Sequence, residues 1–550
     1  MRRSRPLPPA VVAIGALGAG LCVYGLWQMS SGEGGKPAPG APPAATAASQ
    51  PAPEAAAGVA ARGTGTWETP SPQQAGATAA GALCSGCDVV VVTVCSLRRD
   101  HTEPWHDGPS LTPALDRLTE GAWQMNGAWS ASNFTLASLT ALLTGRFGSA
   151  TGVTGWDKGL VADVPTLPEV LGLYGYRTGG FTTDAPSGFR PDYGLDRGFQ
   201  RMEIIPPPRG TPDGRSGSAG RGTPGESAVP AAAWVAAQPA NIPLFVMFHT
   251  RSAHYPFVIQ DDPADLTRVT TLLYNADRVG ASTTAAMPGI AGGTAQRGVV
   301  NVADGDPVAA GVRAAGAAGV AVWRQRYAEA VARLDADFTV LSAALEARGR
   351  LDRTVLVVLA DHGESLDDHG ELLHGDAYYD GVVHIPMLIR IPGLAGKEHD
   401  ALVSQVDVLP TILAAVGAVA PAGVNGASML PLFTGEATSI RTTTLIEGGV
   451  RWHGDGPPRG AVIAPPWALL RQDPGCGGGE AREPGAPATC LFRLDTDPSQ
   501  AHNVAPLHTD VVDDLLGRWE KFRVANGAEA KALTLDPAYV LELRKNGYNF

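Results

Sequence analysis

Three short runs of branched and aromatic apolar residues limit what this chain can fold into. None of them carries a charge, which is typical of strands buried on both faces of a parallel sheet. A fourth run, Ile385 to Ile391, continues the pattern. The three runs are Val89–Val94, Leu244–Phe248 and Val355–Ala360.

Helical repeats alternate with these runs, and the clearest of them stops at Gly349. Strand–helix alternation predicts an α/β fold whose mostly parallel sheet is covered on both faces. In such sheets ligands bind beyond the carboxyl ends of the strands, so polar residues at those ends should converge on one site. The helical repeat consists of Trp323, Tyr327, Val331, Leu334, Phe338, Leu341 and Leu345. The polar residues at the strand ends are Cys95, His249, His254, Asp361 and His362.

The composition supports a large core and argues against a nucleic-acid partner. Of the 550 residues, 44% are hydrophobic, and the formal net charge is -12. A protein that binds nucleic acid needs a basic face to neutralise phosphates. We therefore expect no nucleic-acid partner, and the oligomeric state stays open.

The amino terminus has the features of a membrane anchor. Arg2, Arg3 and Arg5 precede an uncharged apolar segment, Pro9–Met29. A helix of this length spans about 30 Å, one hydrocarbon thickness, and its positive flank holds residues 1–8 in the cytoplasm. We expect a membrane-anchored protein whose globular part lies in the periplasm or the extracellular space. A cleaved signal peptide and a buried core helix are the alternatives.

Three stretches are rich in small residues and proline. Residues 30–82 are expected to form a disordered linker, because they cannot bury enough apolar surface to offset their ordering entropy. Two further stretches, about 206–230 and 261–319, are most simply insertions in surface loops.

Five of the six cysteines follow the apolar segment. Cys476 and Cys490 flank a Gly-rich loop that a disulfide could close in an oxidising compartment. Cys84 and Cys87 could pair locally, with a redox motif as the weaker alternative. Cys95 is then the odd thiol, and it follows the first strand directly.

A second helix is predicted to begin close to Thr135. At a helix N-terminus the unpaired N–H groups and the dipole favour a bound anion and a developing alkoxide, so Thr135 is a candidate nucleophile. The alternative is that Thr135, Ser132 or Asn133 merely caps this helix. The helix is indicated by the spacing of Leu136, Leu139, Leu142 and Leu143, with Gly145 near its end.

Several sequence blocks follow one another in a collinear order: Cys95–Arg98, Leu111–Leu118, Thr135–Ser138, Leu142–Arg146, Asp361–Glu364, His374–Gly375, Ile385–Pro386, Val406–Thr411 and Leu491–Pro498 with Asn503. Together they resemble the sulfatases, a family of the alkaline phosphatase superfamily, over about residues 87–522. The resemblance implies an α/β/α sandwich with a mostly parallel sheet and a smaller carboxyl-terminal subdomain. The corresponding division is a catalytic domain at 83–440, a carboxyl-terminal subdomain at 441–525 and a tail at 526–550.

The resemblance also assigns a role to Thr135. In sulfatases this position holds Cys or Ser, which is oxidised to formylglycine, and Thr cannot yield that aldehyde. Threonine here resembles superfamily branches that transfer phosphoryl groups through a metal-bound Thr. Those branches carry several membrane spans, whereas this chain offers one. The resemblance therefore implies Thr135 as both nucleophile and metal contact.

One divalent metal ion is implied as well. Asp361 and His362 match the metal-binding pair that follows a central strand. His254 and His374 match positions that contact the oxygens of the transferred group or protonate the leaving group.

Cys95 departs from the family, which has an acidic metal ligand at this strand end. One interpretation is that Cys95 binds the metal as a thiolate, which shifts the preference from Ca²⁺, Mg²⁺ or Mn²⁺ towards Zn²⁺. The other is that the metal site has decayed. Asp100 is a replacement ligand to consider, at the limit of its reach.

The sequence therefore predicts a metal-dependent hydrolase of phosphate or sulfate esters that acts on an anionic substrate of the cell envelope or the extracellular space. Thr135 would form a covalent ester that water cleaves. Two alternatives remain open. One is a membrane-anchored phosphoryl-group transferase, and the other is an inactive domain that binds anionic glycans or lipids.

Overall fold

The computed structural model describes residues 82–183, 188–205, 225–255, 257, 312, 316–375, 377–449, 459–472, 476 and 489–545. The predicted anchor at residues 9–29 and all but the last residue of the predicted linker lie outside this part of the chain. So do residues 206–224 and most of the predicted insertion at 261–319. No helix among the described residues combines the length and hydropathy that a membrane span requires.

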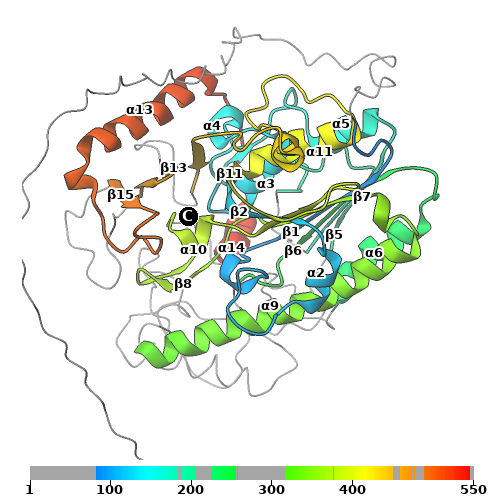
Figure 1. The fold of residues 1–550 in the computed structure, drawn as a ribbon, viewed down its shortest axis with the longest axis horizontal. Coiled ribbons are helices and arrows are strands. Elements are labelled where there is room, and N and C mark those ends of the chain that lie inside the picture. Colours follow the sequence, from blue (N-terminus) through cyan, green and yellow to red (C-terminus); the bar gives the residue numbers. More distant parts are fainter. Residues whose placement is uncertain are drawn as a thin grey trace, which may run out of the picture. The chain divides into compact units, whose positions relative to one another are not determined.

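An eight-stranded sheet forms the centre of the described residues (Figure 1). Its strand order is β11-β2-β10-β7-β1-β6-β4-β5. Every neighbouring pair is parallel except the two pairs that include β10. In this order the strands are Glu398–Ser404, Trp123–Trp129, Met387–Arg390, Thr354–Ala360, Asp88–Val94, Leu244–Thr250, Arg177–Thr182 and Arg201–Ile204.

The predicted strands and the mostly parallel sheet are confirmed. The runs that begin at Val89, Leu244 and Val355 form β1, β6 and β7, which lie side by side at the centre. The fourth run contains β10, which is antiparallel to both of its neighbours rather than a further parallel strand. Apolar periodicity carries no information on strand direction, so the sequence could not have shown this.

Helices lie on both faces of the sheet (Figure 1). On one face the long helix α9 packs against α2 and α6, and on the other α3 packs against α5 and α11. The predicted repeat from Trp323 to Leu345 lies within α9, and its apolar residues are buried. The bounds are Pro113–Leu118 (α2), Thr135–Thr144 (α3), Leu167–Leu173 (α5), Val229–Ala237 (α6), Gly316–Ala347 (α9) and Val408–Val416 (α11).

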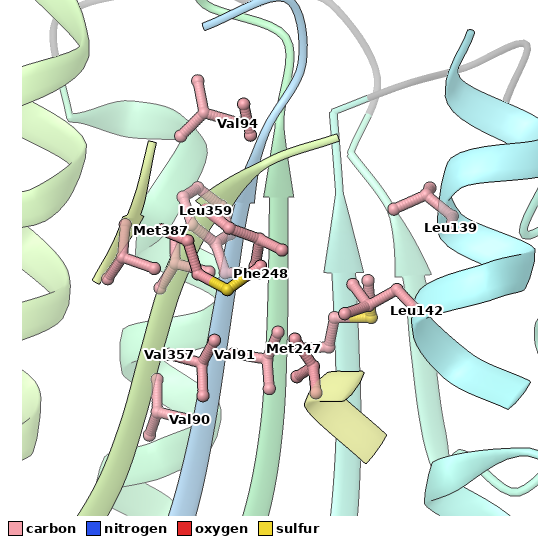
Figure 2. Packing of buried hydrophobic residues seen from close by; sticks show 14 of the residues in the cluster. Val90, Val91, Val94, Leu139, Leu142, Met247, Phe248, Val357, Leu359 and Met387 are labelled. Atoms are coloured by element: carbon pink, nitrogen blue, oxygen red, sulfur yellow. The ribbon is translucent and has the colours of Figure 1, made fainter. Parts of the chain in front are cut away.

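The core between the sheet and α3 fixes where α3 begins. Leu139 and Leu142 point from the helix towards the strands (Figure 2) and are at most 1% exposed. Burial of such a side chain contributes about 2–3 kcal/mol. The helix ends at Gly145, whose left-handed backbone (φ 65°) closes the last turn. Packing therefore holds the first residue of α3, Thr135, at the carboxyl edge of the sheet.

A second, four-stranded antiparallel sheet has the order β12-β13-β14-β15. Helix α13 packs against β13, and its buried Trp519 donates a hydrogen bond to Glu447 Oε1 at 2.7 Å. The small carboxyl-terminal sheet expected from the resemblance is therefore present. These elements are Thr444–Glu447 (β12), Gly460–Ala464 (β13), Trp467–Arg471 (β14), Thr489–Arg493 (β15) and Thr509–Asn526 (α13). The remaining elements are Gly148–Thr151 (α4), Asp380–Val383 (α10), Leu430–Thr434 (α12), Pro537–Lys545 (α14), Lys158–Gly159 (β3), Ser365–Asp368 (β8), Glu371–Leu373 (β9) and Lys531–Ala532 (β16).

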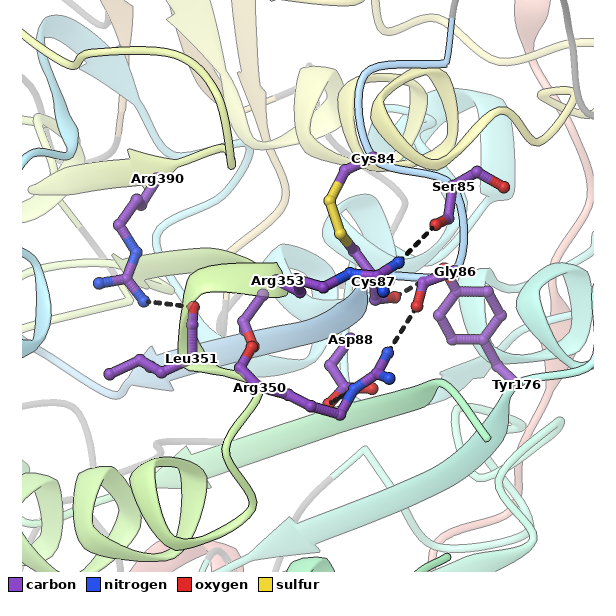
Figure 3. Close-up of a disulfide and its surroundings, with 11 residues drawn as sticks. Cys84, Ser85, Gly86, Cys87, Asp88, Tyr176, Arg350, Leu351, Arg353 and Arg390 are labelled. Carbon is purple, nitrogen blue, oxygen red and sulfur yellow. Dashed lines mark hydrogen bonds and ion pairs between the residues drawn. A yellow bond between two sulfur atoms is a disulfide. The ribbon is translucent and has the colours of Figure 1, made fainter. Parts of the chain in front are cut away.

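Two disulfides join the cysteine pairs expected from the sequence, Cys84–Cys87 and Cys476–Cys490. The first precedes β1 (Figure 3), where Arg350 binds both the Asp88 carboxylate at 3.0 Å and the Gly86 carbonyl at 2.6 Å. These contacts hold the start of β1. Among the described cysteines, Cys95 belongs to neither disulfide.

Candidate active site

The carboxyl ends of β1, β6 and β7 lie next to one another because the three strands are in parallel register. Val94 pairs with both Thr250 and Ala360, so the residues that follow β1 and β7 emerge side by side. The Cys95 amide donates to the Thr250 carbonyl at 2.8 Å, and the Asp361 amide lies 3.4 Å from the Val94 carbonyl. The polar residues at the strand ends therefore converge, as predicted.

Thr135 joins this cluster from α3. Its Oγ1 lies 3.3 Å from the Cys95 Sγ and 3.3 Å from the His362 Nε2. Thr135 is the first residue of the helix, and the N-cap position belongs to Phe134, which has no side-chain capping bond. The capping alternative is therefore wrong: Ser132 and Asn133 do not cap the helix, and the Thr135 hydroxyl faces the cluster instead.

Cys95, Asp361 and His362 form a set of potential metal ligands. Their donor atoms all lie within 4.8 Å of one another, and all three residues are fully buried. Asp361 Oδ1 accepts hydrogen bonds from the amides of Ser96 at 3.2 Å and His362 at 2.7 Å. Asp361 Oδ2 has no hydrogen-bond partner among the described residues.

This donor set fits a divalent cation. A buried carboxylate oxygen without a hydrogen bond is costly unless a cation satisfies it. One sulfur, one nitrogen and one oxygen donor match the ligands that Zn²⁺ accepts. Ser96, next to Cys95, adopts a left-handed backbone (φ 62°), which is uncommon outside glycine and occurs at functional sites.

His254 and His374 lie beside this donor set. The His374 ring is 4.3 Å from the His362 ring and 4.9 Å from the His254 ring, measured between centroids. Arg251 Nη2 lies 2.7 Å from His254 Nε2. The structure therefore brings all six predicted site residues together: Cys95, Thr135, His254, Asp361, His362 and His374.

Burial keeps the three histidines neutral near pH 7. It lowers the pKa of His362 to about 4 and that of His374 to about 3. Burial and the charge of Arg251 hold the pKa of His254 well below its usual value. Burial raises the pKa of Asp361, but His362 and His249 outweigh it, and the pKa lies below its usual value. Neutral imidazoles and an ionised carboxylate are the forms that bind metals.

Two buried residues of the site were not among the predicted site residues. His249, at the end of β6, lies 3.7 Å from Asp361 Oδ2, and its Nδ1 is 2.9 Å from the Thr182 hydroxyl. Gln405 donates to the Asp361 carbonyl at 2.7 Å and accepts from the Ala131 amide at 2.8 Å. His249 had a signal in the sequence, because it follows an apolar run directly. Gln405 had none beyond its place before the block that begins at Val406.

Asp100 is not a replacement metal ligand. Both of its carboxylate oxygens accept hydrogen bonds from Arg98, at 2.9 and 2.7 Å, and one of them also contacts His101 at 2.8 Å. Its side chain is 55% exposed, whereas the potential metal ligands are fully buried. The Asp100 carboxylate therefore forms an ion pair with Arg98 and is exposed to solvent.

Known proteins resemble this chain in both sequence and fold. The family described as Sulfatase matches residues 88–418. Arylsulfatase K of Danio rerio is 27% identical over 195 residues, which cover 35% of this chain and 35% of that protein. The multifunctional alkaline phosphatase superfamily protein PehA of Trinickia caryophylli is 32% identical over 123 residues, which cover 22% of this chain and 24% of that protein. The matched segments thus span about a third or less of these curated relatives.

Among solved structures, the phosphonate monoester hydrolase of Agrobacterium radiobacter superimposes with a TM-score of 0.57 at 18% identity. The superposition covers 80% of this chain and 95% of that one. At this identity the superposition shows a similar fold. It covers much more of the chain than the segments matched in sequence do.

Proposed function

Because the chain belongs to the sulfatase family, we propose that it is a metal-dependent hydrolase of sulfate or phosphate esters with Thr135 as its nucleophile. The observation that carries this proposal is the position of the Thr135 hydroxyl, 3.3 Å from both Cys95 Sγ and His362 Nε2 at the N-terminus of a helix. There the helix dipole stabilises a developing alkoxide and the incoming anionic group.

Cys95, Asp361 and His362, with the Thr135 hydroxyl, would hold one divalent ion, Zn²⁺, Mn²⁺, Ca²⁺ or Mg²⁺. When bound, such an ion lowers the pKa of the hydroxyl and stabilises charge on the transferred group. The thiolate of Cys95 carries the same charge as the carboxylate it replaces and favours Zn²⁺ among these ions.

The protein residues perform a displacement in two steps. The Thr135 hydroxyl first loses its proton to solvent. Its oxygen then attacks the sulfur or phosphorus of the ester, and the departing alcohol oxygen takes a proton from His254 or His374. Water then cleaves the Thr135 ester and returns the proton to the histidine. Hydrolysis of the Thr135 ester consumes this water and regenerates the hydroxyl.

We further propose that residues 9–29 anchor the protein in a membrane and that the catalytic domain acts outside the cytoplasm on an anionic ester. The uncharged length of this segment and its three preceding arginines support the proposal. Two disulfides in the described residues agree with an oxidising compartment.

The test is a screen of the full-length protein, purified in detergent and supplied with each metal, against 4-nitrophenyl phosphate, phosphodiester and sulfate esters. Thr135→Ala should abolish turnover without loss of folding, and Thr135→Ser should retain part of it. Mass spectrometry of quenched reactions should locate a phosphoryl or sulfuryl group on Thr135. Near-parental activity in the alanine variant would contradict the proposal. Turnover only with an added alcohol acceptor would indicate a transferase, and a metal-free, inert protein would indicate a binding domain.

A further inference from the structure

The Glu364 carboxyl group is fully buried and lies against the ring of His374. Its two oxygens are 3.1 and 3.3 Å from the His374 Nδ1. The family resemblance placed Glu364 in a matching block but gave it no function. We infer that Glu364 is a positioning residue, which holds His374 so that its Nε2 gives a proton to the leaving group. This inference rests on the proposed hydrolase function.

A short hairpin brings the two residues together. Strands β8 and β9 are antiparallel, and Ser365 pairs with Leu373. The next pair beyond the hairpin is therefore Glu364 and His374, although ten residues separate them in the sequence. Their contact follows from the hairpin register.

The backbone of Glu364 is fixed on both sides. Its amide donates to the Gly381 carbonyl at 3.2 Å, and its carbonyl accepts from Arg98 Nη1 at 2.8 Å. Gly363 approaches α10 so closely that a Cβ would lie 2.1 Å from the Gly381 oxygen. Arg98 also forms an ion pair with Asp368 of the hairpin. The carboxyl group of Glu364 is thus presented from a rigid support.

The contact assigns separate roles to the two nitrogens of His374. Because Nδ1 is hydrogen-bonded to Glu364, proton exchange with a substrate takes place at Nε2. The His374 side chain is 5% exposed, whereas His254 is completely buried, so His374 is the more accessible of the two to a leaving group. A carboxyl group that orients a catalytic imidazole through Nδ1 is an established way to select its tautomer.

The proton transfer balances in both half-reactions. Glu364 and His374 together hold two protons, one at Nε2 and one in the hydrogen bond at Nδ1. As the ester bond breaks, its electron pair stays on the alcohol oxygen, which takes the Nε2 proton. The proton of the hydrogen bond stays with Nδ1, so the ring is left neutral beside the Glu364 carboxylate. The water that cleaves the Thr135 ester then restores the Nε2 proton.

Leaving-group dependence tests this role. In the full-length protein, Glu364→Met keeps the side-chain volume and removes the hydrogen bond. If Glu364→Met does not fold, Glu364→Ala is measured instead. We expect kcat for phenyl esters, whose leaving group needs a proton, to fall about 100-fold. The kcat for 4-nitrophenyl esters should change little. Glu364→Gln, which keeps a hydrogen bond to Nδ1, should restore most of the phenyl-ester activity.

Asp88→Asn is the matched control. Asp88 is a buried carboxylate at the opposite end of β1, paired with Arg348 and Arg350, so its loss should affect stability without any leaving-group dependence. An equal loss for both esters in the Glu364 variants would overturn the inference and leave the proposed hydrolase intact.

Nuclear magnetic resonance of ¹⁵N-histidine-labelled protein gives a readout independent of turnover. The parent should show one fixed tautomer for His374, assigned with His374→Gln, and Glu364→Met should give a mixture. An unchanged tautomer in Glu364→Met overturns the inference. If the parent protein hydrolyses none of the esters, the proposed function fails, and these spectra still decide whether Glu364 positions His374.

Discussion

The Thr135 hydroxyl lies 3.3 Å from the Cys95 thiol, although 40 residues separate them in the sequence. One residue begins a helix and the other follows a strand, and the core between α3 and the sheet holds both. The proposed nucleophile and the proposed thiolate ligand thus lie in one buried site.

Asp361→Ala and His362→Ala should each remove the bound metal. Both side chains are fully buried and supply donor atoms within 4.8 Å of Cys95 Sγ. The parent should contain one divalent ion per chain by elemental analysis. Asp407→Asn, at a buried carboxylate that pairs with Arg441 instead, is the control and should keep the metal. Equal metal content in all four proteins would refute the assignment.

Cys95→Asp should keep a metal site but change its preference. The carboxylate preserves the charge of a thiolate and is a harder ligand, so relative affinity should move from Zn²⁺ towards Mg²⁺, Mn²⁺ or Ca²⁺. Competition titrations with each ion measure this, and Cys95→Ala should bind all of them weakly. Metal should also slow alkylation of Cys95, so equal alkylation rates with and without a chelator would exclude the thiolate ligand.

His249→Ala should weaken metal binding about 10–100-fold. Mutation of a residue that contacts a metal ligand without binding the metal itself typically lowers the affinity by this factor. His249 lies 3.7 Å from Asp361 Oδ2. A chelator competition assay gives the affinity. Thr182→Val removes only the hydroxyl next to His249 Nδ1, so its effect should be smaller. Unchanged affinity in His249→Ala would show that the contact is incidental.

Asp337→Asn should remove part of the pH dependence of stability. Burial raises the pKa of Asp337 from 3.8 to about 6, against hydrogen bonds from Ser227 and Ser252. The folded protein therefore binds this proton more tightly, and unfolding becomes easier as the pH rises from about 4 to about 6. This rise in the pKa of Asp337 corresponds to a change of roughly 3 kcal/mol in the free energy of unfolding.

Denaturant titrations at several pH values test this prediction. The free energy of unfolding of the parent should fall relative to that of Asp337→Asn between pH 4 and 6, and the difference should be constant above that range. Asp514→Asn, at an exposed carboxylate of α13, should follow the parent. Parallel curves for the parent and Asp337→Asn would refute the assignment.

Deletion of residues 9–29 should release the protein from membranes. This segment is uncharged and about as long as the hydrocarbon core requires. Fractionation of cells that express the full-length and deleted chains measures the partition. A second deletion, confined to residues 30–82, should leave the protein membrane-bound. Retention of the first variant in the membrane fraction would argue against the anchor.

The sequence was informative where a local pattern determines a structure. Uninterrupted apolar runs predicted the central strands. Cys95 and Asp361 follow two of these runs directly, so they were predicted to lie at the carboxyl ends of the strands. The leucine spacing that begins at Leu136 predicted that Thr135 lies at a helix N-terminus. The central strands and the start of α3 depend on which side chains are buried, and the apolar pattern of the sequence predicts burial.

Other features depend on geometry that periodicity does not record. The strands of the β8–β9 hairpin are short and partly polar, and Asp367, His369 and Leu373 all adopt a positive φ. No apolar pattern marks such a hairpin, so the contact between Glu364 and His374 could not be predicted. The direction of β10 was not predicted either, because apolar periodicity is the same in parallel and antiparallel strands.

The hairpin that joins Glu364 to His374 also restricts how many residues can separate them in the sequence. The two arms must keep their register for the pair to meet, so a single-residue insertion or deletion in either arm would separate the side chains. The tip is restricted as well, because His369 and Gly370 both have a left-handed backbone (φ 55° and 69°) that few residues other than glycine adopt readily. In homologous chains the ten-residue interval should therefore be preserved wherever both residues occur.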